Sequence, residues 1–169
     1  MEQTKQKHIR ILYNPKAGNG EGKQTAEAVW LYSKEPNTDC YDLTDPRVCE
    51  QFIKEVTADD TVILCGGDGT LMQFVNSVEP LLPNCRLLYY ASGSGNDFAS
   101  VAGIPSDPDG AAGVLLKGEG EVTDYLECGG VRGINAIGTG IDVDILRRYA
   151  RMKVLKGSAA YLAAFVNTL

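Results

Sequence analysis

The stretch Val62-Ile63-Leu64-Cys65-Gly66-Gly67-Asp68-Gly69-Thr70-Leu71 predicts a buried strand that runs into a glycine turn and then into a helix. Four consecutive apolar residues, two of them β-branched, are typical of a strand covered on both faces. The glycines that follow are expected to adopt φ > 0 conformations, and Thr70 is expected to cap a helix over Leu71–Val78. Such a turn directs backbone N–H groups and the positive end of a helix at one point, an arrangement that binds phosphate.

Asp68 lies at the tip of this turn, where its negative charge would repel a phosphate. It therefore needs a cation or a hydrogen-bond donor between itself and the anion, and we predict that it binds Mg²⁺ or a water on Mg²⁺. The alternative is a tight turn in which the carboxylate bonds its own backbone, a common use of aspartate. The sequence leaves both interpretations open.

Composition restricts the class of protein. The 169 residues fit one ordinary domain, or one domain plus a fragment, and 44% hydrophobic with 22% charged residues is typical of a globular chain. The net charge of −6 argues against a general nucleic-acid-binding role, because neutralising phosphates requires a basic face. No apolar run reaches the length of a membrane span, so any membrane contact is expected to be peripheral.

Cysteine and histidine usage excludes several kinds of site. The five cysteines are widely spaced and form no C-x-x-C pair, which indicates neither a disulfide framework nor a zinc site. They are typical of reduced thiols in a cytoplasmic protein. His8 is the only histidine and lies at the very start of the first expected strand, which excludes histidine-dependent triads.

Strands and helices alternate along the first part of the chain, which predicts an α/β domain. In the helix expected over Gln24–Lys34, the inner face would carry Ala26, Val29, Trp30 and Ser33. Besides the quoted stretch, we expect strands at His8–Tyr13, Cys40–Leu43 and Arg86–Tyr90, and helices at Arg47–Thr57 and Asp107–Leu116, the last ending at Gly118.

The pattern changes near Gly130. Glu121–Cys128 and Val131–Ile137 are expected to be two strands of a hairpin joined at Gly129-Gly130. We therefore predict two domains, residues 1–129 as a nucleotide-binding α/β domain and residues 130–169 as the start of an incomplete second domain.

Three glycine-containing loops follow Tyr13, Cys65 and Tyr90. Because the carboxyl ends of strands in an open α/β sheet lie along one edge, these loops are expected to face one site. The run Gly18-Asn19-Gly20-Glu21-Gly22-Lys23-Gln24 comes close to a Walker A loop. Its first glycine is one residue too near Gly22-Lys23, however, and Gln24 replaces the metal-binding hydroxyl. No loop matches G-x-G-x-x-G either.

Taken together, the three loops resemble the diacylglycerol kinase catalytic domain, a family that includes sphingosine and bacterial lipid kinases and is related to NAD kinases. The resemblance rests on Asn14-Pro15-Lys16-Ala17-Gly18, Gly66-Gly67-Asp68-Gly69-Thr70 and Gly93-Ser94-Gly95-Asn96-Asp97-Phe98-Ala99, in this order and at these separations. Asn96-Asp97-Phe98-Ala99 favours the lipid-kinase branch. Asn135–Asp142 and Lys156–Tyr161 are similar to the start of the family's second domain. The resemblance implies a Rossmann-like three-layer nucleotide-binding domain followed by the beginning of a β-rich, lipid-substrate domain.

The resemblance also implies that the three loops bind ATP and Mg²⁺. Gly66–Met72 matches the loop under the phosphates, with Asp68 in the catalytic Mg²⁺ role, and Ser94 stands where the family usually has threonine. Thr44 matches a further nucleotide contact, and its alternative role is the N-cap of a helix ahead of Asp45-Pro46. The implied cofactor-binding residues are Asn14, Pro15, Lys16, Ala17, Gly18, Thr44, Gly66, Gly67, Asp68, Gly69, Thr70, Leu71, Met72, Ser94 and Asn96.

The implied activity is transfer of a phosphoryl group from ATP to the hydroxyl of diacylglycerol or a similar lipid, by a cytoplasmic protein that contacts the membrane surface transiently. Family members continue into a β-rich domain that supplies the catalytic base and most of the lipid pocket, whereas this sequence stops at Leu169, just after an expected apolar helix over Ala159–Val166. We therefore expect a truncated kinase that lacks the base and that self-associates or needs the missing C-terminal segment. The alternatives are a non-catalytic nucleotide-binding module and an NAD kinase.

Overall fold

The computed structural model describes residues 8–117, 120–151 and 158–168, and its contacts divide the chain into two compact units, Met1–Asn135 and Ala136–Leu169. Gly118, Lys156, Gly157 and Leu169, which the sequence analysis names, lie outside the described residues. The domain boundary expected at residues 129/130 coincides with a hairpin turn inside the first unit, and the division into a nucleotide-binding and a lipid-substrate domain stays a prediction.

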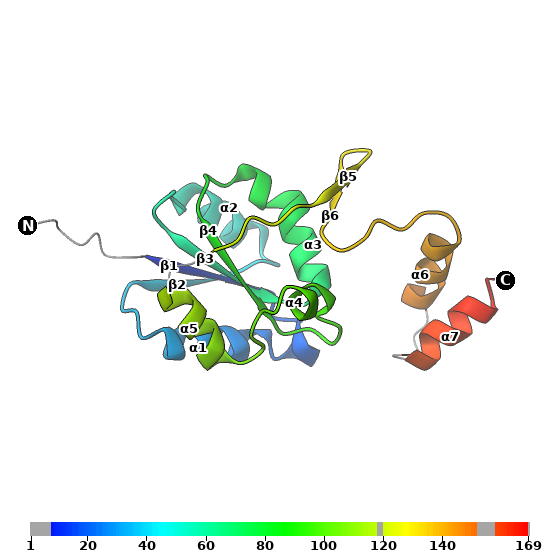
Figure 1. Cartoon of the computed structure of the whole chain (residues 1–169), viewed down its shortest axis with the longest axis horizontal. Coiled ribbons are helices and arrows are strands. Elements are labelled where there is room, and N and C mark those ends of the chain that lie inside the picture. The colour runs from blue at the N-terminus through cyan, green and yellow to red at the C-terminus, as the bar shows by residue number, and fades with distance from the viewer. Residues whose placement is uncertain (1–7, 118–119, 152–157, 169) are drawn as a thin grey trace, which may run out of the picture. The chain divides into compact units, whose positions relative to one another are not determined.

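A parallel four-stranded sheet forms the centre of the first unit (Figure 1). Its strands are β1 (Ile9–Tyr13), β2 (Thr38–Asp42), β3 (Thr61–Gly66) and β4 (Arg86–Ala91), in the order β2-β1-β3-β4. All six residues of β3 are buried, as its apolar run predicts. The chain passes from β1 to β2 on one side of β1 and then crosses to β3 on the other side of β1. The loops after β1 and β3 therefore flank the point where the strand order reverses, which is where open α/β sheets bind ligands.

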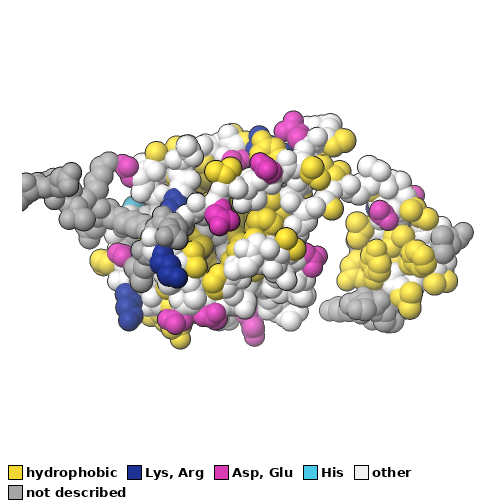
Figure 2. Space-filling view, viewed as in Figure 1, with side chains coloured by type: hydrophobic (Ala, Val, Ile, Leu, Met, Phe, Trp, Pro, Cys, Tyr) yellow, Lys and Arg dark blue, Asp and Glu magenta, His cyan; other side chains and the backbone are white. Residues whose placement is uncertain are grey.

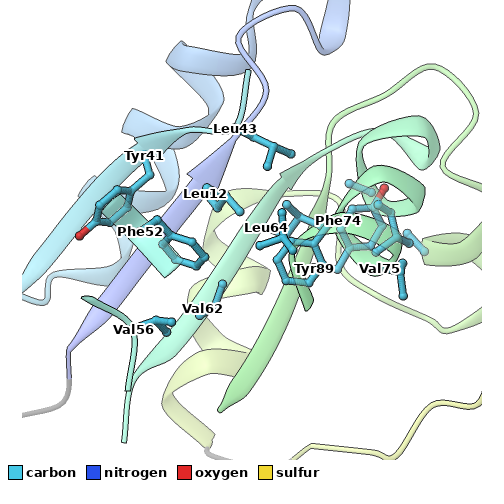
Figure 3. Packing of buried hydrophobic residues seen from close by; sticks show 14 residues of the cluster. Leu12, Tyr41, Leu43, Phe52, Val56, Val62, Leu64, Phe74, Val75 and Tyr89 are labelled. Carbon is cyan, nitrogen blue, oxygen red and sulfur yellow. The ribbon is translucent and has the colours of Figure 1, made fainter. Parts of the chain in front are cut away.

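Helices cover both faces of this sheet (Figure 1). The helices α1 (Gly22–Ser33) and α5 (Pro108–Lys117) pack on one face, and α2 (Pro46–Glu55) and α3 (Asp68–Ser77) pack on the other. Figure 3 shows the second of these cores, where Phe52 of α2 and Phe74 of α3 pack on Leu12, Val62 and Leu64 of the sheet. The predicted three-layer α/β fold is confirmed.

Shorter elements complete the first unit. They are the 3₁₀ turns η1 (Gly18–Gly20) and η2 (Glu79–Leu81), the short helix α4 (Asp97–Val101), and the antiparallel strands β5 (Leu126–Cys128) and β6 (Val131–Gly133). Both residues of the expected Gly129-Gly130 turn have positive φ. The Asn76 side chain of α3 pairs with the backbone of Arg132, donating to its carbonyl at 2.9 Å and accepting from its N–H at 2.8 Å. This pair attaches the hairpin to the domain.

The described residues of the second unit form two helices, α6 (Ile141–Arg151) and α7 (Ser158–Val166). Tyr149 and Tyr161 join them in an edge-to-face contact with ring centroids 6.1 Å apart. The sequence analysis expects α7 but assigns no element to α6. Among the described residues, no helix is both long enough and apolar enough to cross a bilayer.

Four local expectations are wrong. The hairpin strands expected over Glu121–Cys128 and Val131–Ile137 span only Leu126–Cys128 and Val131–Gly133. Trp30 is 44% exposed, because the buried stripe of α1 follows Ala26, Val29 and Ser33 and leaves Trp30 beside it. Thr70 is not a cap, since α3 begins at Asp68 with Gly67 in the N-cap position. Gly67 has φ −89°, and Gly66 and Gly69 also lack positive φ. Gly66 and Gly67 are instead crowded by neighbouring atoms, because a Cβ on Gly66 would lie within 2.6 Å of the Thr70 side chain and one on Gly67 would lie 2.9 Å from the Gly93 Cα, whereas Gly69 has open space.

A buried polar network lies towards the amino ends of the strands. The Arg10 guanidinium donates to Asp60 at 2.7 Å and to the Tyr41 hydroxyl at 2.6 Å, and that hydroxyl donates to Glu55 at 2.7 Å. Burial, reinforced by the bond to Glu55 and opposed by the Arg10 charge, raises the pKa of Tyr41 to about 12. This network satisfies a cation in an otherwise apolar layer.

Candidate functional site

Three loops meet at the carboxyl edge of the sheet. We define them as the first glycine loop (residues 14–21, after β1), the second (66–69, after β3) and the third (92–96, after β4). A Cβ atom on Gly93 would lie 2.5 Å from the Gly67 Cα, and one on Gly67 would lie 2.9 Å from the Gly93 Cα. A Cβ atom on Gly18 would lie 2.9 Å from the Ser92 carbonyl oxygen, and Gly18 also has a φ of +58°. The loops therefore converge at distances that only glycine permits.

Asn14 connects the first loop to the second. Its Nδ2 atom donates to Thr70 Oγ1 at 3.1 Å, and its Oδ1 atom accepts from the backbone N–H of Lys16 at 2.9 Å. The Asn14 backbone N–H in turn donates to the Cys65 carbonyl at 3.2 Å. Asn14 thus fixes the start of the first loop against both β3 and α3.

Asp68 connects the second loop to the third. Its Oδ2 atom accepts a hydrogen bond from the backbone N–H of Asn96 at 2.7 Å. The carboxylate therefore bonds a different loop, whereas the turn interpretation required a bond to its own backbone. Its Oδ1 atom is buried and has no hydrogen-bond partner among the described residues. A buried, unpaired carboxylate oxygen is costly unless a donor or a cation reaches it.

This free oxygen fits the predicted Mg²⁺ role in one respect. Carboxylate oxygen is a ligand that Mg²⁺ prefers, and Mg²⁺ is commonly held by one or two carboxylates together with substrate phosphates. Within the described part of the chain, no group of three or more His, Cys, Asp or Glu side chains could hold a metal ion.

Asn96 shapes the third loop. It has left-handed backbone angles (φ 58°, ψ 38°) at the N-cap of α4, and its side chain bonds both the N–H and the carbonyl of Gly93, at 2.8 and 2.9 Å. Ser94 lies exposed between these two residues. A Cβ atom on Gly95 would lie 2.9 Å from Asp68 Oδ2, so this glycine leaves room for the link between the loops.

The helix α3 begins directly at the second loop and directs its positive end at the edge where the loops meet. Its Thr70 is 5% exposed, and Leu71 is 2% exposed within the hydrophobic core. The Leu71 side chain therefore has no access to a ligand, and any contact by this residue would involve its backbone.

The remaining predicted residues take no part in the contacts between the loops described above. Thr44 is exposed, and both its N–H and its hydroxyl bond Asp42 Oδ1 at 2.7 Å. The alternative role of Thr44 as an N-cap is wrong, since Asp45 caps α2 by accepting from Arg47 N–H at 2.9 Å. Of the others, Lys16 and Gly69 are exposed, and Pro15, Ala17 and Met72 are half-buried.

Ser92 is a residue that the sequence analysis missed. Its backbone N–H donates to the Gly66 carbonyl at 2.9 Å, and its own carbonyl is the atom nearest to a Cβ on Gly18. This residue of the third loop therefore contacts both of the other loops. Its hydroxyl is buried and has no partner among the described residues, as for Asp68 Oδ1. Its place directly after the buried end of β4 was the available signal, whereas the resemblance points to Ser94.

Comparison with known proteins agrees with this geometry. Residues 8–128 match the family described as the diacylglycerol kinase catalytic domain. The chain belongs to this family. Relatives of the family include a diacylglycerol kinase of Bacillus subtilis (strain 168), 29% identical over 164 residues that cover 92% of this chain and 53% of the relative. Another is the protein named "Probable lipid kinase YegS-like" of Xanthomonas campestris pv. campestris (strain 8004), 28% identical over 176 residues that cover 96% of this chain and 56% of that protein.

Solved structures give the same family. A crystal structure of a diacylglycerol kinase from Bacillus anthracis str. Sterne superposes with a TM-score of 0.57 at 25% identity, over 75% of this chain and 45% of that one. The present chain spans about half the length of the curated relatives it matches. Membership in the diacylglycerol kinase family implies the use of ATP.

Proposed function

We propose that this chain is the nucleotide-binding part of an ATP-dependent lipid kinase, which transfers a phosphoryl group to the hydroxyl of diacylglycerol or a similar lipid. The observation that carries the proposal is the convergence of the three glycine loops at the strand-order reversal, with the Asp68 carboxylate bridging two of them. Membership in the diacylglycerol kinase family supports the lipid acceptor over NAD.

The loops would act by position and charge. Transfer of a phosphoryl group requires little covalent chemistry from the protein, and the barrier is lowered chiefly by aligned donors and by neutralised charge. In this proposal the backbone N–H groups around Gly67, at the start of α3, hold the phosphates, and the N-terminus of α3 adds a favourable dipole. Mg²⁺, when bound beside Asp68, would offset the negative charge of the phosphates.

We propose that polypeptide outside this chain supplies the pocket for the acceptor lipid and the base that orients its hydroxyl. The support is that the relatives are about twice as long. A second support is the apolar surface of the second unit, seen in Figure 2. On α7 it consists of Tyr161, Leu162, Phe165 and Val166, of which Leu162 is 63% exposed. Exposed apolar surface of this kind is normally covered by a partner. We propose that further polypeptide or a second copy covers it, and that the lipid is met at a membrane surface.

Two measurements test the proposal. Calorimetric titration of the purified chain with ATP and MgCl₂ should show binding, and absence of binding at millimolar ATP would refute the nucleotide site. The chain, alone and extended by the downstream residues of a full-length relative, is then incubated with labelled ATP and either diacylglycerol vesicles or NAD. Labelled lipid from the extended protein is the expected result. Label on NAD would favour the NAD kinase alternative, and ATP binding without transfer in either form would favour a non-catalytic module.

A further inference from the structure

The bond between Asn14 and Thr70 links the first glycine loop to the first turn of α3. The two residues lie 56 positions apart, and their side chains meet at 3.1 Å. The other polar atom of the Asn14 amide is bonded to Lys16 N–H. Each polar atom of this side chain therefore already has a protein partner, although the resemblance presents Asn14 as a nucleotide contact.

Thr70 is held equally firmly from its other side. A Cβ atom on Gly66 would lie within 2.6 Å of three Thr70 side-chain atoms, so the Thr70 side chain packs directly on the end of β3. The Thr70 backbone N–H donates to the Gly67 carbonyl at 2.9 Å. The hydroxyl of this buried residue thus presents a fixed acceptor to Asn14.

We propose that Asn14 and Thr70 form a pair of positioning residues, which set the distance between the first glycine loop and the first turn of α3 so that backbone N–H groups of both face the same phosphates. The inference rests on the proposed function and changes the role of two of its residues, because neither side chain needs to touch the nucleotide. Donors that are fixed before binding lose less entropy on binding, and this raises affinity.

The test uses the full chain and compares ATP with adenosine, both in MgCl₂, by calorimetry or by competition. Thr70→Val removes the acceptor and keeps the shape, and Thr70→Ser keeps the acceptor. Asn14→Ala removes the donor without changing the helix, and it also removes the oxygen that accepts from Lys16 N–H. Thr38→Val is the matched control. It also removes a threonine hydroxyl bonded within the protein, to the Glu35 carbonyl at 2.8 Å, but at the amino end of β2. Urea unfolding of each variant confirms that it is folded during titration.

We expect Thr70→Val to weaken ATP binding about five- to tenfold, the equivalent of one net hydrogen bond, and Asn14→Ala to weaken it at least as much because it also loses the Lys16 bond. Adenosine affinity should be unchanged, since adenosine has no phosphates. The double variant should be no weaker than Asn14→Ala, and Thr70→Ser should recover most of the affinity. Equal losses for ATP and adenosine, additive losses, or unchanged ATP affinity in both single variants would overturn the pairing. If the unmodified chain fails to bind ATP, the proposed function itself falls, and this inference falls with it.

Discussion

One oxygen of the Asp68 carboxylate accepts a hydrogen bond, at 2.7 Å, from the backbone N–H of Asn96. Asn96 belongs to a different glycine loop and lies 28 positions further along the chain. The second oxygen is buried and has no partner among the described residues. One carboxylate oxygen therefore joins two loops, and the other is available to a ligand. Substitutions can separate these two roles.

Asp68→Asn should separate them, because the amide oxygen can still accept from Asn96 N–H while the charge is lost. We expect the extra ATP affinity that magnesium confers to disappear, with affinity in EDTA unchanged or higher. Asp68→Ala should also lose the bond between the loops and so lower the free energy of unfolding by about 1–3 kcal/mol. Titrations with and without magnesium, together with urea unfolding, measure both effects. A full magnesium effect in Asp68→Asn would show that the metal role is wrong.

Gly93→Ala should damage the site through backbone crowding. The new Cβ would lie 2.5 Å from the Gly67 Cα, and backbone atoms cannot move aside as a flexible side chain could. We expect ATP binding to be lost and the free energy of unfolding to fall by about 1–3 kcal/mol, as for other overpacked positions. Gly69→Ala is the stability control, since a Cβ there meets nothing within 4 Å and alanine favours a helix. Equal stability of the two variants would contradict the prediction.

Ser92→Ala should stabilise the protein, an unusual result for the removal of a buried hydroxyl. The Ser92 hydroxyl has no partner among the described residues, so its removal relieves a desolvation cost of about 1 kcal/mol. Ser33→Ala is the matched comparison. Ser33 is also buried, but its hydroxyl donates to the Trp30 carbonyl at 2.8 Å, and its loss should destabilise the chain. Urea midpoints of the two variants should therefore shift in opposite directions. A loss of stability in Ser92→Ala would mean that the hydroxyl is satisfied in solution.

Alkaline pH should destabilise the first unit partly through Tyr41. In the folded chain its pKa is raised to about 12, whereas in an unfolded chain it is about 10. The folded state therefore retains a proton that the unfolded state releases between these values, and stability falls as pH rises from about 10 to 12. The contribution is on the order of 2 kcal/mol. Tyr41→Phe should flatten this part of the unfolding curve against pH, measured by urea titration at successive pH values. If the slope of unfolding free energy against pH were unchanged in Tyr41→Phe, a group other than Tyr41 would be responsible for the alkaline loss of stability.

Much of the fold could be predicted because local patterns were sufficient. The apolar run Val62–Cys65 and the glycine turn after it gave a buried strand, and strand–helix alternation gave the parallel sheet. The helix α6 also carried a readable signal, with Asp142 and Asp144 in its first turn and Arg148 and Arg151 in its last, which match the helix dipole. The sequence analysis did not use that signal.

The remaining features depend on contacts between distant residues. The strand order, the approach of Gly67 to Gly93 and the bond between Asn14 and Thr70 each join segments that share no local pattern. The glycines of the second loop illustrate the difference. Their presence in a turn was predictable, but the assumed cause was positive φ. Only the folded chain reveals that the Thr70 side chain excludes a Cβ on Gly66 and that the Gly93 backbone excludes one on Gly67.

The three glycine loops belong to three separate strand–helix units, and this affects how the protein folds. No single unit, and no consecutive pair of units, contains all the groups that meet at the site. A partly folded chain therefore lacks the complete site. A ligand that binds there would select the complete sheet alone, and at a concentration of 100 Kd it would stabilise that state by about 2.7 kcal/mol. Nucleotide binding would then serve as a sensor of whether β4, the last strand of the sheet, has joined the others.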